Sequence, residues 1–101
     1  MNKYSLFNKF LVQEGKRDKM VDIMLQAAES MNELKECEIY LVNTDENEQN
    51  AVYVYEVWSD AAAHQASLNQ EAAQTLISEA KPLIKGVERI STMQAMGGKG
   101  I

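Results

Sequence analysis

The sequence of 101 residues has one cysteine and no long apolar segment, and each of these absences excludes a class of protein. Cys37 has no second cysteine with which to form an internal disulfide, which fits a reducing compartment and predicts a cytoplasmic protein. No apolar run approaches the ~20 residues that cross a bilayer, and the N-terminal segment lacks the apolar stretch of a signal peptide. With 10 basic and 15 acidic residues, the net charge of -5 argues against nucleic-acid and membrane partners, which are bound mainly through Lys and Arg.

Most standard catalytic and metal-binding motifs are also absent. The chain has no HExxH, CxxC pair, GxSxG or Walker A loop. One histidine and one cysteine cannot make a structural zinc site, so we expect no metal. Glu36 and Glu38 flank Cys37, and their negative charge raises the pKa of a thiol, which favours a small packing residue over a nucleophile.

The pattern of apolar and polar residues predicts one domain with four strands and two helical regions. Aspartate and asparagine residues make the segment 44–50 a polar hairpin loop. Pro82 should end or bend the second helical region, and Gly86 should follow it as a stop. The predicted strands cover 4–12, 37–43, 51–58 and 87–96, and the predicted helical regions cover 16–34 and 60–85, the second with a break near 69–70.

The order β-α-β-β-α-β predicts a ferredoxin-like α+β sandwich, in which a four-stranded antiparallel sheet carries its helices on one face. We expect a single domain over residues 1–96 and a flexible Gly-rich tail over 97–101. Two helical regions can cover only one face of the sheet, yet both faces of the predicted strands are apolar. We therefore expect a homodimer that pairs through the uncovered sheet face.

His64 is the first candidate for chemistry, because it is the only histidine in the chain. It lies four residues into the helix that follows Trp58 and Asp60. A neutral imidazole can act as a base or proton shuttle near pH 7. A histidine at this position could equally be a surface or packing residue.

Asn8 and Trp58 are candidates because of the strand faces that they share. By alternation, Asn8 lies on one face with Phe10, and Trp58 lies on one face with Glu56 and Val54. If both faces turn toward the helices, an amide and an indole project into an apolar layer, as in many small-molecule pockets. The structural alternatives are a core anchor for Trp58 and a satisfied strand polar group for Asn8.

Over about residues 4–96, the chain resembles the antibiotic biosynthesis monooxygenase (ABM) family, or quinol monooxygenase-like proteins, of the dimeric α/β-barrel superfamily. The resemblance rests on a first strand that ends before Gly15, and on the strand start Cys37-x-x-Tyr40. It rests also on Glu56-Val57-Trp58-Ser59-Asp60 followed by a helix that contains alanine and histidine. It implies that two sheets pair into a dimeric α/β barrel, with one pocket per subunit between sheet and helices.

The resemblance further implies a cofactor-independent monooxygenase that uses O2 to oxidise a small aromatic quinol or anthrone. In such chemistry the substrate is deprotonated and the anion reacts directly with O2. Asn8 and Trp58 would donate hydrogen bonds to a substrate or peroxide oxygen, and His64 would be the base or shuttle. Substrate-binding positions implied for this chain are Phe10, Tyr40, Val54 and Glu56.

Two alternatives stay open. The first is a non-catalytic dimer that binds a small aromatic ligand or serves in stress or sensing. The second is haem binding or degradation, because haem-degrading relatives resemble this chain at Asn8 and Trp58. Those enzymes need a histidine iron ligand later in the second helical region, where 71–81 has none and His64 lies about two turns too early. Many quinol-branch members carry their histidine near Ser67 instead.

Overall fold

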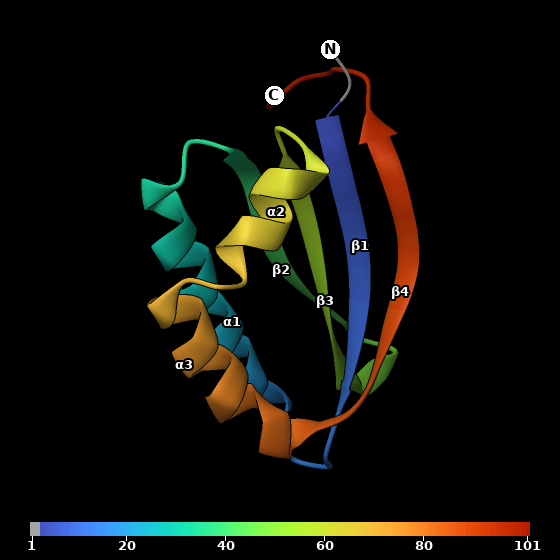
Figure 1. The fold of residues 1–101 in the computed structure, drawn as a ribbon. Coiled ribbons are helices and arrows are strands. Elements are labelled where there is room, and N and C mark those ends of the chain that lie inside the picture. The colour runs from blue at the N-terminus through green and yellow to red at the C-terminus, as the bar shows by residue number, and fades with distance from the viewer. Residues whose placement is uncertain (1–2) are drawn as a thin grey trace.

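The computed structural model describes residues 3–101 as a four-stranded antiparallel sheet with the helices on one face (Figure 1). The β-α-β-β-α-β order and the ferredoxin-like α+β class are confirmed. The strands are β1 (Lys3–Val12), β2 (Cys37–Asp45), β3 (Glu48–Trp58) and β4 (Ile84–Ala95), in the spatial order β2-β3-β1-β4. The helices are α1 (Arg17–Ser30), α2 (Ala61–Ser67) and α3 (Glu71–Ala80), with short 3-10 helices η1 (Met31–Glu33) and η2 (Lys81–Leu83).

The hairpin between β2 and β3 is tighter than the sequence predicts. Asp45 already pairs with Glu48, so only two residues form the turn in place of the expected loop over 44–50. The Oδ1 atom of Asp45 accepts a hydrogen bond from the backbone N–H of Asn47 at 2.9 Å, which closes an Asx-type turn. Polar side chains at this solvated end do not prevent the two backbones from pairing, which is why hydropathy alone ended the second strand too early and started the third too late.

The second helical region breaks near 69–70, as predicted. Its α-helix ends at Ala80, and the 3-10 helix η2, which contains Pro82, ends at Leu83, two residues before the predicted limit. The assignment of Gly86 as a helix stop is wrong, because β4 starts at Ile84 and Gly86 pairs with Leu11 of β1. The domain limits of 1–96 and the flexible tail over 97–101 stay predictions. Met1 and Asn2 lie outside the described residues.

The core lies between the inner face of the sheet and the helices. Alternate residues of β1 and β3 point to this side, so Val12, Val52 and Val54 are buried. They pack against Met20 and Ile23 of α1, whose spacing places them on one helical face. The strand faces that carry Asn8 and Glu56 are therefore turned toward the helices, which is the arrangement that a pocket requires.

The outer face of the sheet has no helix over it in the described part of the chain (Figure 1). Phe7 lies there with Tyr53 and Tyr55, at ring-centroid distances of 5.8 and 6.4 Å. Leu41 of β2 is on the same face and is 54% exposed. Within residues 3–101, no helix is long and apolar enough to span a membrane.

Candidate functional site

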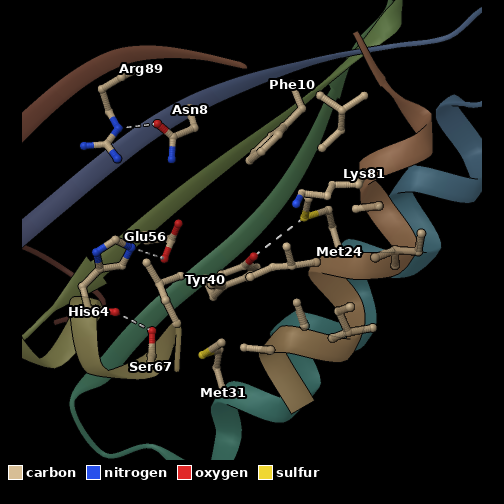
Figure 2. A pocket seen from close by; sticks show the side chains of 18 residues that line it. Asn8, Phe10, Met24, Met31, Tyr40, Glu56, His64, Ser67, Lys81 and Arg89 are labelled. Carbon is tan, nitrogen blue, oxygen red and sulfur yellow. Dashed lines mark hydrogen bonds and ion pairs between the residues drawn. The ribbon is translucent and has the colours of Figure 1, made fainter. Parts of the chain in front are cut away.

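A cavity of about 300 Å³ lies between the inner face of the sheet and the helical layer (Figure 2). Its helical wall comes from α1, α2 and α3 and from the residues that follow α2 and α3. Most of its wall is apolar, and four polar or charged side chains gather at one end. These are Asn8, Glu56, His64 and Arg89.

Asn8 is held in one orientation by Arg89 of β4. The two residues are neighbours across the β1–β4 ladder, and the Nε–H of Arg89 donates to Oδ1 of Asn8. Arginine has no acceptor atom, so the amide oxygen must face it and the amide N–H groups must face elsewhere. Figure 2 shows the amide nitrogen of Asn8 turned away from Arg89. Asn8 can therefore offer a fixed donor to a ligand oxygen.

Glu56 is a carboxyl group that is almost removed from water. It is 7% exposed and lines the cavity from the inner face of β3. Its Oε1 atom accepts a hydrogen bond from Nε1 of Trp58 at 2.9 Å. Burial raises the pKa of Glu56 above 4.5, although the Trp58 hydrogen bond and the positive charge of Arg89 act in the opposite direction. A raised pKa favours a carboxyl group that can hold or release a proton.

His64 enters the cavity from the first turns of α2. Asp60 starts this helix, because its carboxylate accepts the backbone N–H of Ala63 at 2.7 Å. The imidazole packs edge-on against Trp58 at a centroid distance of 5.5 Å, and its Nε2 atom lies 3.9 Å from Oε1 of Glu56. Burial, and then the charge of Arg89, hold the pKa of His64 below its ordinary 6.5. His64 is therefore neutral at pH 7 and able to accept a proton.

Of the seven predicted site residues, five line one cavity: Asn8, Phe10, Tyr40, Glu56 and His64. Trp58 and Val54 do not. Each is 1% exposed; Val54 packs in the core, and Trp58 uses its one N–H to hold Glu56. Trp58 therefore positions Glu56 from outside the cavity, whereas the family resemblance implies a donor that faces the ligand.

The sequence pattern did not indicate the two cations of the cavity, Arg89 and Lys81. Arg89 faces Asn8 only because the β1–β4 register shifts between Phe7 and Asn8, and a shift of this kind leaves no mark in residue alternation. Lys81 could have been found, because it directly follows α3 and lies four residues after Ile77, which also lines the cavity.

Cys37 lies outside the cavity wall. Burial, with smaller contributions from Glu56 and Glu38, raises the pKa of its thiol to about 11, so the thiolate is scarce at pH 7. This supports the interpretation of Cys37 as a packing residue. Over residues 3–101, no cluster of three or more His, Cys, Asp or Glu side chains is arranged to hold a metal ion.

Comparison with protein families matches residues 4–78 to the antibiotic biosynthesis monooxygenase model. A solved structure from Chloroflexus aurantiacus, described as a "putative Antibiotic biosynthesis monooxygenase", is 31% identical, with 98% of each chain covered and a TM-score of 0.84. A protein from Caulobacter crescentus with the same description is 15% identical over 95% of this chain and 92% of its own, with a TM-score of 0.82. A protein from Shewanella oneidensis is 20% identical over 93% and 91%, also at 0.82. The latter two likenesses concern the fold alone. A search of curated proteins gave no match.

Proposed function

Because the chain belongs to the antibiotic biosynthesis monooxygenase family, we propose that it oxidises a small aromatic quinol or anthrone with O2 and without a cofactor. For an anthrone, the reacting CH2 carbon becomes a carbonyl. One oxygen atom of O2 forms that carbonyl, and the other leaves as water with the two hydrogens of the carbon. The substrate supplies all four electrons, so the reaction balances without a second reductant.

The observation that carries this proposal is the neutral, half-buried imidazole of His64 at the polar end of an apolar cavity. His64 would take the proton whose loss makes the substrate electron-rich enough to react with O2. Burial lowers the pKa of His64 and raises that of Glu56, so the two values approach each other. This reduces the free-energy cost of passing a proton between the two groups, which lie 3.9 Å apart. The fixed N–H of Asn8 would stabilise the negative charge on oxygen.

Oxygen consumption tests the proposal directly. We expect protein-dependent uptake with at least one member of a panel of benzoquinols, naphthoquinols and anthrone, at one O2 per substrate and without released peroxide. The matched control is the same panel with heat-denatured protein, which measures spontaneous oxidation. Uptake at the spontaneous rate for the whole panel would contradict the proposal, and binding without uptake would favour a non-catalytic ligand-binding protein.

We also propose that the protein acts as a homodimer through the outer face of the sheet, in the cytoplasm, where the unpaired thiol of Cys37 stays reduced. The aromatic cluster of Phe7, Tyr53 and Tyr55, with exposed Leu41 beside it, supports such pairing. A second copy would cover these side chains and would leave the cavity, on the opposite face of the sheet, within each subunit.

Charge placed on this face should separate the dimer. We expect light scattering to give about twice the chain mass of 11.4 kDa for the wild type and the chain mass for Leu41→Asp, because a buried unpaired carboxylate is costly. Leu25→Asp is the matched control, since Leu25 is 51% exposed on α1, away from the sheet face. A wild-type monomer, or equal loss of dimer in both variants, would contradict the proposed interface.

A further inference from the structure

The cavity has a positive balance of charge in a protein that is acidic as a whole. Among the described residues that line it, two cations, Arg89 and Lys81, stand against one carboxyl group, Glu56. His64 adds no charge at pH 7, because its pKa lies below 6.5. The chain overall carries -5. The cavity is therefore a positive site in a negative protein. A positive concave site favours a negatively charged ligand.

The two cations differ in how far their charge is already used. Arg89 donates to Asn8 and, through Nη1, to Thr92 at 3.1 Å. Its positive charge also acts on Glu56, where it partly offsets the rise in pKa that burial causes. The ammonium group of Lys81 has no hydrogen-bond or ion-pair partner within residues 3–101. Lys81 is therefore the cation that is free to bind an anionic group of a ligand.

The charged groups lie at opposite ends of the cavity. Figure 2 shows Lys81 near Met24, at the end of α3, and far from Glu56 and His64 at the other end. A ligand carboxylate beside Glu56 would meet a carboxyl group, whereas one beside Lys81 would meet an unpaired cation. The wall between the ends is apolar and includes Phe10 and Leu76, which suits a flat aromatic body.

The size of the cavity limits that body. A closed apolar cavity of about 150 Å³ accepts one benzene molecule. The present cavity of about 300 Å³ has room for roughly two rings. A two-ring compound fills it, and substituents at its ends can reach both polar regions. Among the substrates proposed above, this volume favours a two-ring naphthoquinol over a three-ring anthrone.

We infer that the ligand of this cavity is a two-ring hydroxyarene that carries a carboxylate at its far end, with the hydroxyl group beside Glu56 and His64 and the carboxylate beside Lys81. The inference rests on the proposed function for the placement of the reacting hydroxyl group. The preference for an anion rests on the charges of the cavity alone.

Calorimetric binding of three probes tests the inference: 6-hydroxy-2-naphthoate, its methyl ester and 2-naphthol. The first has its hydroxyl and carboxylate groups at opposite ends, and the ester keeps the shape without the charge. We expect the acid to bind about fivefold more tightly than the ester, the upper range for an ion pair open to solvent. Added salt should reduce this preference, since it screens exposed charges.

Lys81→Ala should abolish the preference for the acid, and Lys81→Glu should reverse it in favour of the ester. Lys85→Ala is the matched control, because Lys85 is an exposed lysine nearby in the chain that does not line the cavity. Equal affinities for acid and ester, an unchanged preference in Lys81→Ala, or no binding of the acid would each overturn the inference.

Binding of these probes requires no turnover, so the two proposals fail separately. Oxygen uptake with neutral quinols but no preference for the acid would keep the proposed function and overturn this inference. A preference for the acid that depends on Lys81, without oxygen uptake for any quinol, would keep the carboxylate site at Lys81 and overturn the proposed function.

Discussion

Replacing His64 by alanine should lower kcat/KM for oxygen uptake by about 100-fold or more, the scale of a lost general base. His64 is the only histidine in the chain, and its Nε2 atom faces the buried carboxyl group of Glu56 at the polar end of the cavity. Gln65→Ala is the matched control, because Gln65 lies on the same helix and is exposed to solvent. Added imidazole should restore part of the activity of His64→Ala, which a purely structural role would not allow.

The pH profile gives an independent measure of the same role. The base must be neutral to accept a proton, so activity should be lost as the pH falls through the pKa of His64, which lies below 6.5. Activity at pH 7 should therefore lie on the plateau. Arg89 is the second cause of the lowered pKa, so Arg89→Met should move the acidic limb to higher pH.

Loss of less than about tenfold in His64→Ala would contradict the base role, and would make Glu56 the next proton acceptor to test.

The features of the site that follow from strand alternation could be predicted from the sequence. Alternation is a property of the backbone, so Asn8 must share a face with Phe10 in β1, and Glu56 must share a face with Val54 in β3. The β1–β3 register, in which Leu6 pairs with Glu56, then places both faces on the helix side. The position of His64 follows in the same way from the Asp60 cap that starts α2 one turn earlier. Strand alternation and the helix cap predict these positions correctly, because the helices cover one face of the sheet and so fix which face is buried.

The features that depend on register and depth could not be predicted in this way. Arg89 reaches Asn8 through a register shift in the β1–β4 ladder, which depends on how two distant segments meet. Trp58 shares the inner face with Glu56, but it lies at the end of β3, where α2 covers it and its N–H meets Glu56 before any ligand. Alternation tells which face a side chain is on, and not how far along that face the cavity extends.

Removing the indole of Trp58 should have the largest effect on stability. Trp58 is 1% exposed and is the largest fully buried side chain in the described residues. Trp58→Ala should lower the free energy of unfolding by about 3–5 kcal/mol. Domains of this kind have about 5–15 kcal/mol in total, so urea denaturation followed by circular dichroism should show a protein close to unfolding.

Trp58→Phe isolates the hydrogen bond from the packing. Phenylalanine keeps most of the buried ring but has no N–H, so Glu56 loses its 2.9 Å donor while it stays buried. An unsatisfied buried acceptor costs about 1–3 kcal/mol, and the loss should raise the pKa of Glu56 further, because this hydrogen bond lowers it. In a double-mutant cycle with Glu56→Leu, the two changes should be less than additive, since leucine leaves no acceptor for the indole to satisfy. Strict additivity would contradict a coupling between Trp58 and Glu56 and would reduce Trp58 to a core residue that acts through volume alone.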